Sequence, residues 1–186
     1  RLVAREYQFL EERNDVYSPS SSSSIVRLFP ALLASGEVSS SWCWAGFDIG
    51  DAFLMVPQPK LRKVRIIDSS ETFIIAKCLP GQRDGTKRWF NFFTSYLAVE
   101  HGMETCKECP ALVRGDHCLL LLHVDDVLMI GDPSWINKEF LPKLKENFRV
   151  SFQIASKLGQ KVEFLKRKYT LVEDGILVRP SSENVN

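Results

Sequence analysis

Two adjacent aspartates interrupt the most hydrophobic stretch of this 186-residue chain. Asp125 and Asp126 lie between the apolar runs 119–122 and 127–130, each of which has the length of a buried strand. The pattern predicts a tight hairpin with both aspartates at its tip. Two negative charges at the bend are costly unless something neutralises them, and divalent cations bind carboxylate oxygens. The alternative is an Asx-type turn, in which the aspartates only cap backbone groups.

A third carboxylate, Asp48, lies near the end of a buried strand predicted over 42–49. From this strand onward, with a hairpin over 60–78 set aside as an insertion, the predicted elements run strand, helix, strand, strand, helix, strand. That order is the split βαβ, or ferredoxin-like, arrangement, in which the first strand and the central hairpin are neighbours. The predicted fold class is therefore α+β, a sheet with helices on one face, and Asp48, Asp125 and Asp126 are expected to converge.

Three converging carboxylates would raise one another's pKa values unless cations occupied the site. Two Mg²⁺ (or Mn²⁺) ions about 3.5–4 Å apart can hold the attacking and leaving oxygens of a phosphoryl transfer. Such catalysis depends mostly on positioning and electrostatics. We expect Asp48 and Asp125 to hold the metals and Asp126 to contribute more weakly, whereas Asp51 is expected to be solvated or to cap a backbone group.

The other elements follow from periodicity and turn signals. One helix is predicted over 25–35, a second carries its apolar face from Trp89 to Val99, and a third runs over 133–148. The tail 162–178 predicts two strands that turn at Glu173-Asp174-Gly175.

Composition limits the classes of protein and partner. A net charge of +1 leaves only local patches to attract nucleic acid. No apolar run approaches the roughly 20 residues of a membrane helix, so no membrane partner is expected. Five cysteines at irregular spacing favour an intracellular protein, cytoplasmic (including virus-like particles) or nuclear. No common zinc-binding motif has the spacing of Cys106-Lys107-Glu108-Cys109. The chain starts without Met, as we expect of an excised segment.

The aspartate segments resemble motifs of a known family. Residues 47–54 resemble the first aspartate motif of copia-type LTR-retrotransposon reverse transcriptases, and residues 122–128 resemble the second. Residues 1–5 are similar to the start of the fingers region, and 17–33 to the segment that leads to the first aspartate. Leu79-Pro80-Gly81-Gln82, with the aromatic pair 89–90 downstream, is similar to the loop and helix under the incoming nucleotide. Five landmarks in one order extend over nearly the whole chain.

The resemblance implies a polymerase palm with part of the fingers. Residues 1–41 would be the partial fingers, 42–150 the palm, and 151–186 a basic hairpin leading toward a missing thumb. The implied activity is that of an RNA-directed DNA polymerase (reverse transcriptase) fragment acting on deoxynucleoside triphosphates and a primer on an RNA or DNA template. Asp48, Asp125 and Asp126 would then form the catalytic, metal-binding triad.

Further positions carry over one by one. Gln82 would lie near the incoming nucleotide, and either Arg5 or Arg1 would face the triphosphate. Phe53 matches an aromatic position near the nucleotide sugar, although a core role is equally compatible with its place. His123 departs from the family, which usually has Tyr there near the primer end, so the change is either tolerated or a mark of reduced activity.

Basic residues of the tail could follow the phosphates of primer and template. Lys161, Lys166, Arg167 and Lys168 fit such a surface, and a solvated charged face is the alternative. The cluster at 60–65 has the same two interpretations. Two other functions remain open for the whole chain: a decayed retroelement-derived domain that binds nucleic acid or metal without polymerising, and an unrelated ferredoxin-like module that binds metal or RNA.

Overall fold

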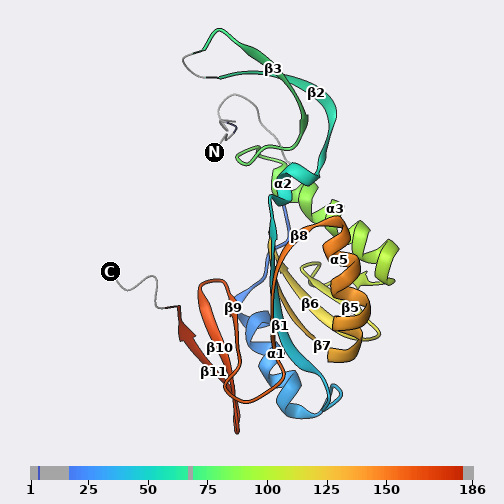
Figure 1. The fold of residues 1–186 in the computed structure, drawn as a ribbon, viewed down its shortest axis with the longest axis vertical. Helices are drawn as coiled ribbons and strands as arrows, with labels where there is room; N and C mark the ends of the chain where they lie inside the picture. Colours follow the sequence, from blue (N-terminus) through green and yellow to red (C-terminus); the bar gives the residue numbers. More distant parts are fainter. Residues whose placement is uncertain (1–3, 5–16, 67–68, 182–186) are drawn as a thin grey trace. The chain divides into compact units, whose positions relative to one another are not determined.

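The computed structural model describes residues 4, 17–66 and 69–181 (Figure 1). The chain forms two compact units, which we describe separately. The first unit comprises residues 1–18 and 51–93, and the second comprises 19–50 and 94–186. These units are discontinuous in sequence, so they do not test the predicted division into fingers, palm and tail.

The second unit contains a six-stranded antiparallel sheet with the strand order β4-β5-β6-β7-β1-β8. Its four long strands are β1 (Cys43–Gly50), β6 (Cys118–His123), β7 (Asp126–Gly131) and β8 (Arg149–Ala155). Their order, β6-β7-β1-β8, is that of the predicted split βαβ arrangement, so this expectation is confirmed. Two short strands that were not predicted, β4 (Glu104–Thr105) and β5 (Leu112–Gly115), extend the sheet beyond β6.

One face of this sheet is covered by the helical segment after β7. The segment consists of α4 (Pro133–Trp135), a π-helical turn η2 (Ile136–Phe140) and α5 (Leu141–Asn147), where the sequence predicted one continuous helix. Phe47 of β1 lies 5.7 Å from Phe140 and 5.8 Å from Phe152 between ring centroids. The packing explains why β1 is apolar at alternate positions on this face.

The opposite face is covered by α1 (Ser23–Ser35) and a small antiparallel sheet. That sheet consists of β9 (Lys161–Phe164), β10 (Arg167–Val172) and β11 (Gly175–Pro180). Trp44 of β1 packs edge-on against Phe29 of α1, with ring centroids 6.3 Å apart, and in a tilted arrangement against Tyr169 of β10, with centroids 5.3 Å apart. The helix predicted over 25–35, within the partial fingers segment, therefore lies on this second face, where Phe29 is buried, whereas the two helices predicted within the palm segment pack against each other on the first face.

Three strands form in the tail, where two were predicted. The turn at 173–174 lies where the sequence placed it, between β10 and β11. A second turn, Leu165–Lys166, separates β9 from β10, and both residues have left-handed φ values of 50° and 59°. Two positive φ values define a type I′ hairpin turn, which normally uses Asn or Gly. Leu and Lys give no sign of such a turn in the sequence.

The first unit contains α2 (Ala52–Met55), the hairpin of β2 (Pro57–Arg65) and β3 (Thr72–Lys77), and the start of α3 (Gly85–His101). The predicted hairpin is present, and β2 begins before the predicted strand. On α3, the residues Trp89, Phe93 and Leu97 are buried at intervals of four, which fixes the apolar face. Val99 is 81% exposed, so its assignment to that face is wrong. Within the described ranges, no helix has the length and apolar character needed to cross a membrane.

Candidate active site

The strand pairing brings two of the three predicted carboxylates to opposed positions. Asp48 of β1 pairs directly with Asp126 of β7, and Asp126 pairs with His123 of β6. Directly opposed residues of antiparallel strands project from the same face, so these three side chains form a row across the sheet. The backbone N–H of Ile49 also donates to the Asp125 carbonyl at 3.1 Å, which ties the hairpin turn to the end of β1.

The turn itself is strained. It consists of Val124 and Asp125, and Asp126 is the first residue of β7, so the prediction of both aspartates at the tip is correct only for Asp125. Val124 has a φ of 58°, in the left-handed region that a β-branched residue rarely occupies. A positive φ at the first central residue alone is typical of a type II′ turn, which favours Gly there. Such strain is concentrated at functional sites in proteins.

The surroundings of Asp48 and Asp126 disfavour the charged form of both carboxyl groups. Burial raises the pKa of Asp48, and the nearby Asp125 raises it further, while Arg149 opposes both effects. Burial also raises the pKa of Asp126, and the charges of Asp48 and Asp125 add to this rise. His123 and a hydrogen bond from the backbone of Leu165 lower the pKa of Asp126 again. The aspartates therefore repel one another as like charges, and a bound cation would reduce this repulsion.

Arg149 is a cationic neighbour of the row that the sequence did not point to. It is the first residue of β8 and pairs with Gly50, two positions beyond Asp48 on the same face. A Cβ added to Gly50 would lie 2.5 Å from the Arg149 Nε, so the glycine leaves room for the guanidinium. Nothing in the local sequence at 149 signals this role, because the contact arises from strand order alone.

The β9–β10 hairpin lies over the same face of the sheet. A Cβ added to Gly46 of β1 would lie 2.5 Å from the Val162 Cγ1 and 3.3 Å from the Glu163 carbonyl oxygen, so β9 crosses β1 in close contact. The Leu165–Lys166 turn that follows β9 supplies the N–H that bonds Asp126. A turn is thus placed beside Asp126 although it lies about 40 residues away in sequence.

The four predicted basic residues of the tail do not form one patch. Lys168 pairs with Glu163 at 3.3 Å and shares the outward face of the small sheet with Lys161. Arg167 is in register with the buried Phe164, which places it at the end of the opposite face, and Lys166 lies in the turn. Of these four residues, Lys166 and Arg167 directly follow Leu165, whose backbone bonds Asp126.

The remaining predicted site residues belong to the first unit. Gln82 is only 6% exposed, and its Oε1 accepts hydrogen bonds from the Leu79 N–H and the Gln58 amide, both at 2.8 Å. Phe53 is half-buried, and its ring would be 3.2 Å from a Cβ on Gly85, so it packs over the start of α3. Arg5 lies outside the described residues. A role of these residues at the nucleotide stays a prediction.

The carboxylate row is not a preformed metal cage. Among the residues that the structure describes, no three His, Cys, Asp or Glu side chains are grouped so that they could hold a metal ion. The donors are nonetheless of the kind that Mg²⁺ and Mn²⁺ prefer, and burial, followed by the neighbouring carboxylates, raises the pKa values of Asp48 and Asp126. The convergence of Asp48, Asp125 and Asp126 on a cation therefore stays a prediction.

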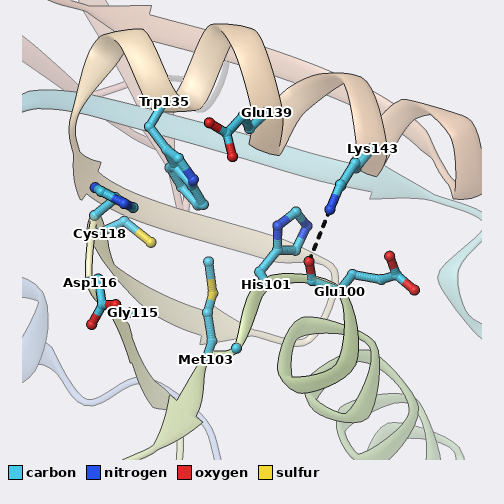
Figure 2. Close-up of a pocket in the computed structure, with 11 residues that line it drawn as sticks. Glu100, His101, Met103, Gly115, Asp116, Cys118, Trp135, Glu139 and Lys143 are labelled. Atoms are coloured by element: carbon cyan, nitrogen blue, oxygen red, sulfur yellow. Dashed lines mark hydrogen bonds between the residues drawn. The ribbon is translucent and has the colours of Figure 1, made fainter.

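A cavity of about 280 Å³ lies on the other side of the sheet, between the end of α3, the β5–β6 turn and the α4–α5 segment (Figure 2). Trp135 stacks on His117 at 5.5 Å, and the Nζ of Lys143 donates to the Glu100 carbonyl at 3.3 Å. Burial, then Lys143, lowers the pKa of His101, whose Nε2 is buried without a hydrogen-bond partner in the described structure. No predicted site residue lines this cavity.

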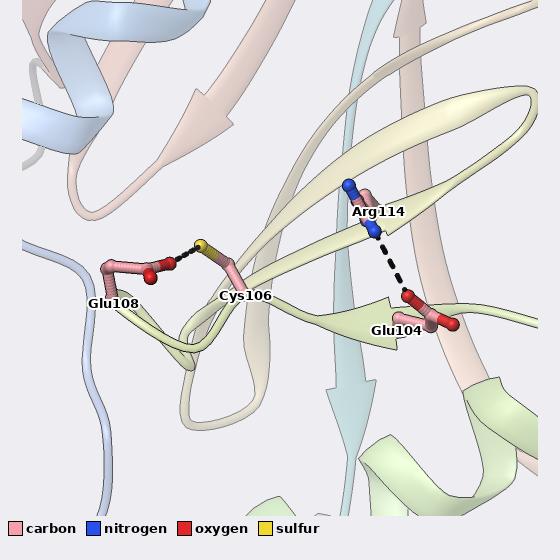
Figure 3. A network of polar contacts seen from close by, with 4 residues as sticks. All are labelled: Glu104, Cys106, Glu108 and Arg114. Atoms are coloured by element: carbon pink, nitrogen blue, oxygen red, sulfur yellow. Dashed lines mark hydrogen bonds and ion pairs between the residues drawn. The ribbon is translucent and has the colours of Figure 1, made fainter.

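The cysteine-rich connection lies at the edge of the sheet (Figure 3). Cys106 donates to the Glu108 carboxylate at 3.3 Å, and Arg114 of β5 pairs with Glu104 of β4 at 3.2 Å. All five cysteines of the chain are free thiols in the structure. Burial raises the pKa of Cys118 to about 12, which makes this thiol an unreactive core residue.

Comparison with known proteins gives two kinds of similarity. The chain is 24% identical over 112 residues to the transposon Ty1-GR3 and Ty1-OR Gag-Pol polyproteins of Saccharomyces cerevisiae, a match that covers 60% of this chain and 6% of each polyprotein. Its structure is similar to that of a telomerase from Candida albicans, solved in complex with the TWJ fragment of telomeric RNA, with a TM-score of 0.52 and 11% identity over 96% of this chain and 37% of that one. No family model matches.

These similarities relate the chain to retrotransposon polyproteins in part of its sequence and to telomerase in its fold. The chain spans a small part of the curated polyproteins that it matches and about a third of the structural neighbour. What those larger proteins do is therefore considered for this chain only as a proposal.

Proposed function

We propose that this chain is the palm-containing part of a retroelement reverse transcriptase, and that it joins a deoxynucleotide to a primer 3′-hydroxyl. The observation that carries the proposal is the row of Asp48, Asp126 and His123, with Asp125 in the strained turn beside it. The resemblance of both aspartate segments to copia-type motifs, the partial match to Ty1 polyproteins and the likeness to a telomerase fold support it.

In this proposal, Asp48 and Asp125 hold two divalent cations, and Asp126 supports them. The cations would offset the negative charge of the triphosphate and of the developing oxyanion. The carboxylate oxygens fit this role because they are hard donors, and because the turn that carries Asp125 is tied to β1 at Ile49.

The neighbouring cationic groups would act on the phosphates. Arg149 projects on the carboxylate face, where its guanidinium can bind phosphate oxygens in a bidentate manner. Lys166 and Arg167 lie at the turn that bonds Asp126 and would contact the primer or template backbone. His123 would lie near the primer end, where the resembled family has Tyr. The template would be RNA or DNA.

Primer extension tests this function. The 186-residue chain is incubated with a primed RNA template, deoxynucleoside triphosphates and Mg²⁺ or Mn²⁺, beside the variants Asp125→Asn and Asp174→Asn. The control residue Asp174 is exposed in the β10–β11 turn. We expect extension that Asp174→Asn keeps and that Asp125→Asn reduces by at least about 100-fold, because loss of one metal-binding carboxylate removes transition-state stabilisation. Equal extension by all three proteins would rule out the assigned site.

One observation favours a second candidate, a retroelement-derived domain that binds nucleic acid without polymerising. The described carboxylates form no ready group of metal ligands, and His123 departs from the resembled motif. This candidate predicts that the chain binds a primer–template duplex while neither the chain nor Asp125→Asn extends the primer.

A further inference from the structure

A hydrogen bond links the segment before α1 to the carboxylate row. The hydroxyl of Ser21 lies 2.9 Å from the Nδ1 of His123, across 102 residues of sequence, and the contact is partly buried. Ser21 directly precedes Ser22, whose side chain caps α1 by accepting from the Ile25 N–H. Because α1 is fixed to the sheet through Phe29 against Trp44, the position of Ser21 is set by the core.

This bond engages one of the two ring nitrogens of His123. The other nitrogen, Nε2, remains for groups at the row, where His123 stands directly opposite Asp126. A carboxylate is a hydrogen-bond acceptor, and so are the phosphate oxygens of a nucleic acid. A proton on Nε2 therefore suits this environment, and a neutral imidazole that carries its proton on Nε2 must accept at Nδ1.

We propose that Ser21 is a positioning residue whose hydroxyl donates a hydrogen bond to His123 Nδ1. This bond holds the ring with its Nε2–H directed to a phosphate oxygen of a bound primer. The phosphate contact rests on the proposed function, whereas the effect of Ser21 on the ring does not. In this proposal, a hydrogen bond from another element fixes which ring nitrogen of His123 donates. The histidine can then donate a hydrogen bond at a position where the resembled motif has Tyr.

The first test examines the ring without any nucleic acid. Long-range ¹H–¹⁵N NMR of the histidine-labelled chain identifies the protonated nitrogen, and His123→Gln assigns the signals among the three histidines. We expect one protonated nitrogen, Nε2, at His123, and changed ring shifts with a mixed tautomer in Ser21→Ala. Ser21→Thr, which keeps the hydroxyl, should restore the original shifts, and Ser20→Ala, at an exposed neighbour, should leave them unchanged. A His123 ring that does not respond to Ser21→Ala overturns the proposal.

The second test measures the consequence for binding. Fluorescence anisotropy gives the Kd for a labelled primer–template duplex in the wild type, Ser21→Ala, His123→Ala and the double variant. We expect Ser21→Ala to weaken binding about three- to tenfold in the wild-type background, the effect of one hydrogen bond, and to have no effect when His123 is absent.

The outcomes separate the two levels of the proposal. An equal loss in both backgrounds would mean that Ser21 supports the fold only, and would overturn its role through His123. A wild-type chain that binds no duplex, but whose His123 ring responds to Ser21→Ala, would overturn the phosphate contact and count against the proposed function, while the positioning of the ring by Ser21 would stand.

Discussion

Asp48 and Asp126 occupy directly opposed positions on neighbouring strands, where a pair of like charges destabilises a sheet. The surroundings reduce this repulsion only in part, through Arg149 beside Asp48, and through His123 and the Leu165 N–H beside Asp126. Two carboxylates in such a place destabilise the folded chain, and the cations of the proposed function would offset their repulsion.

Replacing one of the opposed aspartates should stabilise the chain in the absence of divalent cations. Asp126→Asn removes the repulsion and keeps an oxygen that can accept from Leu165, so we expect it to raise the free energy of unfolding by up to about 1 kcal/mol at pH 7 in EDTA. Urea unfolding followed by tryptophan fluorescence measures the change. The same substitution at the exposed Asp174 should have little effect, and a destabilised Asp126→Asn would contradict the assigned repulsion.

At the scale of elements, the site depends on how closely the small sheet approaches the large one. β9 crosses β1 at Gly46, where only a glycine fits against Val162. The crossing places the Leu165–Lys166 turn beside Asp126. The contact between the two sheets therefore determines both the stability of the second unit and the surroundings of the carboxylates.

Adding a methyl group at this crossing should separate the strands. We expect Gly46→Ala to lower the free energy of unfolding by about 1–3 kcal/mol, since Val162 and the β9 backbone must move. In a Val162→Ala background the added methyl group has space. The loss of free energy of unfolding caused by Gly46→Ala should then be less than about half of its value in the wild-type background. Chemical denaturation of the four proteins of this double-mutant cycle gives the coupling, and strictly additive effects would contradict the packing described.

The α3–α4 side of the sheet predicts a pH dependence. Burial and Lys143 lower the pKa of His101, while Glu100 and Glu139 oppose the shift. Below about pH 6.5 the unfolded chain takes up a proton at this histidine that the folded chain does not, so the free energy of unfolding should fall as the pH decreases through this range. The fall should end below the lowered pKa of the folded state.

His101→Gln should remove this component of the pH dependence. The free energies of unfolding of the variant and the wild type are measured between pH 7.5 and pH 5. As the pH decreases, the value for the wild type should fall more than the value for the variant. His117→Gln, in the wall of the same cavity, is the matched control and should keep the component due to His101. A constant difference between His101→Gln and the wild type would contradict the lowered pKa.

The elements with clear periodicity were predictable from the sequence, and their long-range contacts were not. β1, β6, β7 and α1 follow from apolar patterns and capping, and their order correctly predicted that Asp48 and Asp126 would be neighbours. The turn at Leu165–Lys166 was missed because neither residue normally adopts a positive φ. Arg149 and the bond between Ser21 and His123 were missed because they arise from tertiary packing and leave no local pattern.

At the scale of the whole molecule, the two units differ in how well their strands are covered. β6 and β7 of the second unit are buried on both faces along most of their length. The β2–β3 hairpin of the first unit is two-stranded and mostly exposed, including Leu61 and Ile74 at 69% and 61%. An isolated two-stranded hairpin is only marginally stable in water, so we expect the pairing of β2 with β3 to have low intrinsic stability.

Hydrogen exchange should reflect this difference. We expect amides of β2 and β3 to exchange more than about tenfold faster than those of β6 and β7, because opening the hairpin exposes little buried apolar surface. Mass spectrometry of peptides after timed exchange measures both regions in one experiment. Added primer–template duplex should slow exchange in β2 and β3 if the exposed Lys60, Lys63 and Arg65 bind phosphates; equal rates in the four strands of the free chain would contradict the account.

The central claim is that the carboxylates at the end of β1 and in the β6–β7 hairpin bind divalent cations together. Electron paramagnetic resonance of Mn²⁺ titrated into the chain measures this directly, because bound and free ions give different signals. We predict saturable binding in the wild type and in Asp174→Asn, and at least about tenfold weaker binding in both Asp48→Asn and Asp125→Asn. Equal Mn²⁺ affinity in the wild type and in both of these variants would contradict the claim.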